Sequence, residues 1–307
     1  MSVALAMVAA VWLDAWLGEA RRYHPLVGFG RLASWMERRL NPAASYGGAT
    51  YAGMAAWGML VLIPSAATFG VRQSVPLAWA WGLDVVVLYV ALGRRSLADH
   101  ARPIATALDA GDLSAAREAV GRMVSRDTDA LDATQVAGAA TESVLENGHD
   151  AVFGALFWFA LFGAPGAMLF RLANTLDAMW GYRTPRYLRF GWAAARADDV
   201  LGFLPARLTA LSYAFAGRFA GAMRCWRTQA RRWKSPNAGP VMAAGAGALG
   251  VALGGPAPYH GRWEARPALG DGPPADAGSV RGALRLVDRG VAFWLGVMLL
   301  WGVATHA

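Results

Sequence analysis

Residues Thr50–Gly93, TYAGMAAWGMLVLIPSAATFGVRQSVPLAWAWGLDVVVLYVALG, contain two long apolar runs separated by a short connection. The runs are Thr50–Gly70 and Pro76–Gly93, and the connection carries a single charged residue, Arg72. A helix needs about 20 predominantly apolar residues to cross the hydrocarbon core of a bilayer. The stretch therefore predicts two membrane-spanning helices joined by a tight turn.

The composition of the whole chain also indicates a membrane protein. Of its 307 residues, 56% are hydrophobic and only 16% are charged, and the mean hydropathy is +0.30. Soluble domains usually have about 25% charged residues, so this chain has too few to cover a surface that faces only water. The 14 tryptophans agree with a bilayer, because indole rings favour its interfaces. The single cysteine, Cys225, excludes an internal disulfide and a thiolate metal site.

Three further apolar segments complete the predicted membrane domain. Residues 2–18 and 290–305 are predicted as spans, although both are short. Residues 151–173 are interrupted by Gly163-Ala164-Pro165-Gly166, which weakens a helix. This segment is either a re-entrant hairpin buried in protein or a kinked single span.

We therefore predict an all-α, polytopic membrane protein with four to five hydrophobic helical segments, forming one domain over residues 1–307. No strand-like alternation is long enough to predict a sheet. Residues 254–278 are rich in glycine and proline and are predicted to be irregular.

The arginines predict the orientation of the spans. Loops that remain in the cytoplasm carry an excess of basic residues. By this rule the polar segments 19–49, 94–150 and 174–289 are cytoplasmic, in the inner (plasma) membrane of a bacterium. Asn147 and Asn174 would then lie on the same side, which favours the hairpin for residues 151–173.

An acidic stretch is the first candidate for chemistry. On a helix, Asp132, Gln135, Glu142, Glu146 and Asp150 would fall within about 80° of one another. No lysine or arginine occurs between Arg126 and Arg171, so we interpret these carboxylates as uncompensated and available to Mg²⁺ with nucleotide phosphates. Glutamine in place of Glu142 or Glu146 should then leave the helix as stable or more stable. The alternative is an ordinary solvated helix face.

The next polar region has the opposite charge. Residues 171–234 contain twelve basic residues and three acids, Asp177, Asp198 and Asp199. We expect Arg196, which lies beside Asp198-Asp199, to face a phosphorylated substrate, and Arg231 with Arg232 to face lipid or water. The net charge of +8 comes without an aromatic-interleaved basic patch, so nucleic acid is not expected as a partner. The sequence has no Walker A loop and no paired histidine spacing typical of a zinc site.

Many short motifs, in order along nearly the whole chain, resemble the CobD/CbiB family of adenosylcobinamide-phosphate synthases. They include His24-Pro25, Ser96-Leu97-Ala98-Asp99-His100, Ser125-Arg126-Asp127-Thr128, Glu142-Ser143, Glu146-Asn147, Asp150, Asn174-Thr175-Leu176-Asp177, Gly181-Tyr182, Arg196, Asp198-Asp199, Pro205-Ala206-Arg207-Leu208-Thr209, Ser235-Pro236-Asn237-Ala238-Gly239 and Tyr259. Two departures, Ala151 and Ala155, stand where the family is associated with glycine and proline.

The resemblance implies a ligase of cobalamin biosynthesis. Adenosylcobyric acid is coupled through a carboxylate to aminopropanol or aminopropanol phosphate, with ATP and Mg²⁺ as cofactors. Membrane lipid and other corrin-assembly enzymes are the implied partners. Whether the amine is phosphorylated stays open.

Roles follow for the matching residues. We predict the catalytic residues to be Glu142, Glu146, Asp177 and Arg196, the substrate-binding residues to be His24, Arg126, Asn147, Asn174, Tyr182, Arg207 and Asn237, and the metal ligands to be Glu142, Glu146, Asp150, Asp198 and Asp199. Two other functions remain as alternatives. One is a Mg²⁺-dependent membrane transferase of the prenyl-diphosphate type, and the other is a non-enzymatic corrinoid transporter or scaffold.

Overall fold

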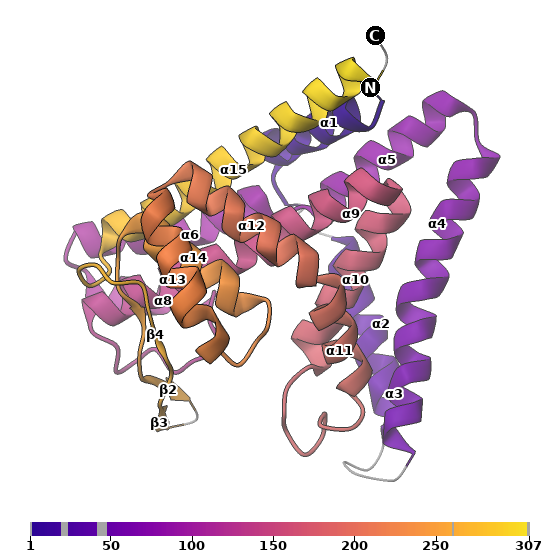
Figure 1. Cartoon of the computed structure of the whole chain (residues 1–307). Coiled ribbons are helices and arrows are strands. Elements are labelled where there is room, and N and C mark those ends of the chain that lie inside the picture. The colour runs from indigo at the N-terminus through magenta and orange to yellow at the C-terminus, as the bar shows by residue number, and fades with distance from the viewer. Residues whose placement is uncertain (1, 20–23, 42–47, 260, 306–307) are drawn as a thin grey trace. The chain divides into compact units, whose positions relative to one another are not determined.

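The computed structural model describes residues 2–19, 24–41, 48–259 and 261–305. Within these ranges the chain is mainly helical (Figure 1). Three helical stretches are long and apolar enough to cross a membrane: Ala49–Ser74, Leu77–Asp109 and Ala277–Ala304. The prediction of an all-α, polytopic membrane protein is confirmed. The orientation of the polar segments stays a prediction.

The chain divides into two compact units. Unit 1 consists of Met1–Gly93, Asp150–Gly202 and Met298–Ala307, and unit 2 of Arg94–His149 and Phe203–Val297. Both units contain parts of the candidate spans. A single membrane-embedded domain therefore stays a prediction.

Unit 1 is built from helices. They are α1 (Ser2–Leu17), α2 (Pro25–Leu40), α3 (Ala49–Trp57), the π-helix η1 (Gly58–Leu62), α4 (Ile63–Ser74), α5 (Leu77–Ala91), most of the π-helix η2 (His149–Phe153), α9 (Gly154–Phe162), α10 (Ala164–Trp180) and α11 (Trp192–Leu201). Leu60, Leu176, Trp180 and Phe190 lie in its hydrophobic core. Gly53 allows α3 to come close to this core. A Cβ at this position would lie 1.9 Å from the carbonyl oxygen of Phe190, so any larger residue would clash.

The interrupted segment 151–173 is a helical hairpin. Helices α9 and α10 meet at Gly163, whose φ of +66° is a left-handed conformation that favours glycine. A Cβ at Gly154, at the start of α9, would lie 2.1 Å from the ring of Phe170 in α10, so the two helices pack antiparallel. Helix α9 continues directly from the π-helix η2, so its nine residues are only the last part of a longer helical run. Whether residues 151–173 re-enter or span the membrane stays a prediction.

Asp84, inside a predicted span, has a structural role. Its Oδ1 accepts hydrogen bonds from Arg72 Nε (2.9 Å) and from the backbone N–H of Ala164 (3.1 Å). The first N–H groups of a helix have no partner within the helix and carry partial positive charge. The carboxylate thus joins α4, α5 and the start of α10.

Unit 2 consists of a helical bundle and two small sheets. Its elements are α6 (Arg94–Asp109), α7 (Leu113–Gly121), α8 (Ala133–Gly148), α12 (Phe203–Ala216), α13 (Phe219–Gln229), the 3₁₀-helix η3 (Ala230–Arg232), α14 (Ala238–Leu249), β1 (Leu253–Gly254), β2 (Ala257–Tyr259), β3 (Arg262–Glu264), β4 (Ala268–Leu269) and most of α15 (Ala277–Ala304). Strand β1 pairs antiparallel with β4, and β2 with β3.

Helix α14 is the centre of unit 2, and nearly all its residues are buried. Small residues allow close packing: a Cβ at Gly247 would lie 2.4 Å from the carbonyl oxygen of Gly221 in α13, and one at Gly245 would lie 2.6 Å from Leu145 in α8. The sequence analysis missed this helix, because its twelve apolar residues lie in a segment predicted to be polar, 174–289.

Two further expectations need correction. The residues predicted to be irregular, 254–278, form most of the two short sheets, whose strands of two or three residues show no readable periodicity. The predicted last span, residues 290–305, is the end of a longer helix, because α15 begins at Ala277 and continues for 28 residues.

Candidate functional site

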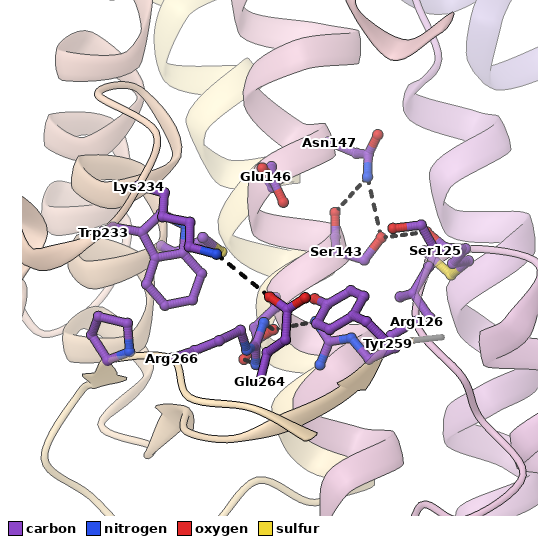
Figure 2. A pocket seen from close by; sticks show the side chains of 15 residues that line it. Ser125, Arg126, Ser143, Glu146, Asn147, Trp233, Lys234, Tyr259, Glu264 and Arg266 are labelled. Atoms are coloured by element: carbon purple, nitrogen blue, oxygen red, sulfur yellow. Dashed lines mark hydrogen bonds and ion pairs between the residues drawn. The ribbon is translucent and has the colours of Figure 1, made fainter. Parts of the chain in front are cut away.

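Unit 2 contains a pocket of about 400 Å³ beside the last two turns of α8 (Figure 2). Its lining comes from the segment before α8, from α8 and α14, from the residues after η3, and from the two sheets. The lining residues are Met123, Val124, Ser125, Arg126, Glu142, Ser143, Glu146, Asn147, Trp233, Lys234, Met242, Tyr259, Glu264, Arg266 and Pro267. Of the predicted site residues, Arg126, Glu142, Glu146 and Asn147 are brought together here.

A capping box at the start of α8 fixes this helix. Asp132 Oδ1 accepts from the N–H of Gln135 (2.8 Å), and Gln135 Oε1 accepts from the N–H of Asp132 (2.9 Å). Two residues of the predicted acidic stripe are thus used at the helix N-terminus. Farther along, the spacing of four residues places Glu142 and Glu146 on the same helix face.

Glu142 is not an uncompensated carboxylate. Its side chain is 4% exposed, and its oxygens accept hydrogen bonds from Arg126 (2.6 Å) and Arg266 (3.0 and 3.1 Å). Its Oε1 also accepts from the N–H of Gly254 (2.7 Å). The interpretation from the sequence is wrong because Arg266 comes from the loop between β3 and β4, far from Glu142 along the chain.

The charge on Glu142 is strongly held. Burial alone would raise the pKa of this carboxyl, but Arg126 and Arg266 outweigh burial and lower it. A carboxylate with a lowered pKa and four hydrogen bonds is a poor proton acceptor and has little capacity left for a metal ion. The geometry thus gives Glu142 the role of positioning the two guanidinium groups.

Glu146 lies one helical turn beyond Glu142 and is half-buried. In Figure 2 it lies between Trp233 and Lys234 on one side and Asn147 on the other. The amide of Asn147 donates to the carbonyl oxygen (2.9 Å) and Oγ (3.1 Å) of Ser143. Glu146 is therefore a second acidic side chain of α8 that lines this pocket.

A second pocket of unit 2, of about 660 Å³, contains another predicted residue, Arg207. Its guanidinium donates to Asn237 Oδ1 (3.0 Å) and to the carbonyl oxygen of Phe203 (2.8 Å), so two predicted substrate-binding residues, Arg207 and Asn237, are in contact. Arg231 lines the same pocket. The expected division between a substrate-facing Arg207 and an Arg231 that faces lipid or water stays a prediction, although both residues line this pocket.

The remaining predicted residues belong to unit 1, and several form a cluster between α10 and α11. Asn174 Nδ2 donates to Asp198 Oδ1 (3.2 Å), and Arg196 pairs with Asp199 at 2.9 Å. Burial raises the pKa of Asp177 to about 6, and the charge of Asp199 adds to the shift, whereas Arg196 opposes it. Carboxylates that repel one another in this way are oxygen donors suited to a divalent cation.

The pKa of Asp177 gives a prediction for stability. Because its value rises from 3.8 to about 6 on folding, its contribution is fully present below pH 3.8 and is lost as the pH rises through 6. In EDTA, Asp177→Asn should therefore be more stable than the parent at about pH 8, by about 1–2 kcal/mol after allowance for partial exposure. Melting temperatures between about pH 4 and 8 check this. Parallel curves for the parent and the variant would contradict it.

Three other predicted residues also belong to unit 1. His24 caps α2 by accepting from the N–H of Leu26 (3.3 Å). Tyr182 is exposed, and Asp150 lies in η2. Within the described residues, no three histidine, cysteine, aspartate or glutamate side chains are grouped closely enough to hold a metal ion by themselves.

Sequence reasoning missed four charged or aromatic residues of the first pocket: Trp233, Lys234, Glu264 and Arg266. Lys234 lies 3.5 Å from Glu264, and the guanidinium of Arg266 lies 5.4 Å from the ring centroid of Trp233. No local sequence motif indicates that these four residues belong to the pocket. Only the two-stranded sheets bring Glu264 and Arg266 to α8.

Comparisons with known proteins agree on one family. A family model described as "CobD/Cbib protein" matches residues 7–287. The chain is 57% identical to the cobalamin biosynthesis protein CobD of Stutzerimonas stutzeri, over 98% of this chain and 99% of that protein. It is 55% identical to the protein of the same name from Chromobacterium violaceum over the full length of both, and 39% identical to that of Mycobacterium tuberculosis over 97% of this chain and 96% of the relative. No solved structure matches.

Proposed function

The chain belongs to the CobD/CbiB family, and from this premise we propose that it joins adenosylcobyric acid to aminopropanol or its phosphate through an amide bond, at the expense of ATP. Family membership supports a role in cobalamin biosynthesis. The observation that carries the specific reaction is the first pocket of unit 2. It combines two guanidinium groups, held in place by Glu142, with a separate carboxylate, Glu146.

The reaction needs an activated acid, because a carboxylate is a poor electrophile. A carboxylate oxygen attacks the γ-phosphorus of ATP, ADP leaves, and an acyl phosphate forms. The amine nitrogen then attacks the acyl carbon, phosphate leaves and the nitrogen loses a proton. Both steps place negative charge on oxygen atoms, so cationic hydrogen-bond donors at the reacting carbon stabilise them.

Arg126 and Arg266 supply such donors. Glu142 engages part of each guanidinium, and both side chains are 10% exposed. A guanidinium has five N–H groups, so each arginine retains donors for a carboxylate or an acyl phosphate. Because Glu142 fixes the two groups before substrate arrives, little reorganisation is required in the transition state.

Glu146 is the base in this proposal. The substrate amine is mainly protonated at neutral pH and must lose protons to attack and to form an amide. Glu142 is unsuited, because two arginines lower its pKa, and Glu264 is paired with Lys234. Glu146 is half-buried in the same pocket, one helical turn beyond Glu142, and we assign it the role of accepting a proton from the amine.

The carboxylates of unit 1 fit a magnesium ion. Mg²⁺ in nucleotide sites is commonly held by one or two carboxylates together with phosphate oxygens. Asp177 and Asp199 crowd negative charge, as the raised pKa of Asp177 indicates, and Asp198 lies beside them. These residues of unit 1 would hold the ion.

The size of the pocket limits what it holds. About 400 Å³ is at the lower end of the range for small-molecule sites. It accommodates the reacting carboxylate and the short amine, while the corrin ring remains outside. The small volume and the polar side chains of this pocket favour this reaction over a prenyl-diphosphate transferase, whose substrate carries a long apolar chain.

An assay of the purified protein tests the proposal. The protein in lipid nanodiscs is incubated with ATP, Mg²⁺, adenosylcobyric acid and either aminopropanol or its phosphate. Mass spectrometry of the corrinoid and measurement of ADP should show one condensed product for each ADP formed. Absence of product, while a related CobD protein is active in the same preparation, would reject the reaction.

A further inference from the structure

The second pocket of unit 2 is a basic groove formed by α12, α13, η3 and the start of α14. Four cationic side chains line it: Arg207, Arg227, Arg231 and Lys234. Two tryptophans, Trp226 and Trp233, are also part of the lining, and none of the lining residues is an aspartate or glutamate. Its volume of about 660 Å³ is sufficient for a ligand of nucleotide size.

The arginines of this basic groove lack the ion pairs that several other arginines of unit 2 have. Arg126, Arg224 and Arg281 each contact a carboxylate. In the described part of the chain, Arg207, Arg227 and Arg231 contact none at ion-pair distance. Adjacent positive charges without counter-charge repel one another, so an anion that binds here gains from all of them.

Neutral groups hold Arg207 in position. Asn237 and the carbonyl oxygen of Phe203 accept its hydrogen bonds, and its guanidinium lies 3.6 Å from the ring centroid of Phe203. Burial lowers the pKa of Arg207, which shows that its charge is partly removed from water without compensation. The guanidinium is therefore oriented in advance and retains donors for an incoming oxygen anion.

The basic groove adjoins the pocket in which we place amide formation. Trp233 and Lys234 line both. On the pocket side, Arg266 lies over the ring of Trp233, and Lys234 faces Glu264 (Figure 2). The basic groove and the pocket thus have these two side chains in common.

We propose that the basic groove binds the polyphosphate chain of a nucleoside triphosphate. A triphosphate carries about the same charge as the four cations, and arginines bind phosphate oxygens through paired N–H groups. The half-buried Trp226 offers an aromatic surface to a base. This inference rests on the proposed function, which places amide formation in the adjoining pocket. It adds where the ATP used in that reaction would bind. The headgroup of an anionic lipid has the same phosphate chemistry, and the experiment below distinguishes lipid from nucleotide.

The test is equilibrium binding of ATP to the full-length protein in nanodiscs of phosphatidylcholine, with EDTA present so that no turnover occurs. The variant combines Arg227→Ala with Arg231→Ala, and a charge-matched control combines Arg232→Ala with Arg285→Ala. Both control residues are exposed and lie outside the lining of the groove. We expect the groove variant to weaken ATP binding about 100-fold, roughly tenfold for each charge-assisted contact, and the control by less than about threefold. Equal affinities for the parent and the groove variant would overturn the proposal.

A second arm identifies lipid. The same proteins are reconstituted with phosphatidylglycerol, and retained lipid is measured by native mass spectrometry. Loss of retained phosphatidylglycerol in the groove variant, with unchanged ATP affinity in phosphatidylcholine, would make the groove a lipid site and reject the nucleotide. Failure of the reaction itself gives a different result. If ATP binding depends on Arg227 and Arg231 but no amide forms, the nucleotide site is retained and the ligase reaction is rejected. If the groove variant forms the amide with the same KM for ATP as the parent, the reaction is retained and the nucleotide site is rejected.

Discussion

Replacing Glu142 with glutamine is expected to destabilise unit 2 by about 3–5 kcal/mol, the typical effect of removing one member of a buried ion pair. Glutamine can keep hydrogen bonds to Gly254 and to one guanidinium. However, Arg126 and Arg266 would then face each other, both about 90% buried, without the negative charge that now lies between them. Urea-induced unfolding in mixed micelles, followed by near-UV circular dichroism, measures the change.

An exposed pair provides the matched control. Glu118 and Arg122 are four residues apart on the surface, with side chains that are 72% and 68% exposed. Such pairs contribute about 0.3–0.5 kcal/mol, so Glu118→Gln should barely shift the transition. A loss for Glu142→Gln no larger than for Glu118→Gln would show that the buried cluster does not stabilise the fold. Adding Arg266→Met to Glu142→Gln should recover part of the loss, because it removes one of the two buried positive charges.

This result would also show where the sequence misleads. The local composition of the sequence correctly predicts the apolar helices and the break at Gly163. The length and hydropathy of an apolar run, and the conformation of a glycine, depend only on nearby residues. It also identifies Glu142 as unusual, since no basic residue follows it for many turns. The partner Arg266 lies 124 residues farther along the chain. Charge compensation across such a distance depends on tertiary structure, and strands of two or three residues give no periodic signal.

Helix α14 and the basic groove escaped prediction for related reasons. Ala238–Leu249 is short and rich in alanine and glycine, so its hydropathy suggests neither a span nor an amphipathic surface helix. Its packing against α13 and α12 places Arg227 of α13 and Arg231 of η3 in the same pocket as Arg207 of α12. The family motif around Arg207 was visible in the sequence. That Arg231 shares its pocket was not, because the two residues lie on different helices.

The candidate site itself was predicted in part. The acidic residues of α8 do line a pocket with Arg126, but the sequence could not divide their roles. Burial and contacts distinguish them: Glu142 is buried and enclosed by two arginines and a backbone N–H, while Glu146, one turn farther, lines the pocket half-buried. The difference arises from which neighbours reach each carboxylate, and these neighbours are supplied by the loop that carries Arg266.

Glu146→Gln should accordingly leave the protein folded and lower the turnover number for amide formation by about 10²–10⁴, the usual contribution of a positioned general base. Glutamine has the same shape but accepts a proton far less readily. The affinity for ATP should be unchanged, because Glu146 does not line the basic groove. Glu264→Gln is the matched control: it removes a carboxylate from the same pocket, but one that is paired with Lys234 and about half exposed, and it should retain most of the activity.

The choice of amine makes this test specific for proton transfer. Hydroxylamine is mainly unprotonated at neutral pH, so it attacks an acyl phosphate with less help from a base. With hydroxylamine as acceptor, much of the deficit of Glu146→Gln should disappear, and hydroxamate formation measures it. A deficit of equal size for both amines would instead indicate that Glu146 positions substrate or assists formation of the acyl phosphate. Full activity of Glu146→Gln with the natural amine would exclude it as the base, and because Glu142 is held charged by Arg126 and Arg266, the proton would then have to leave through water.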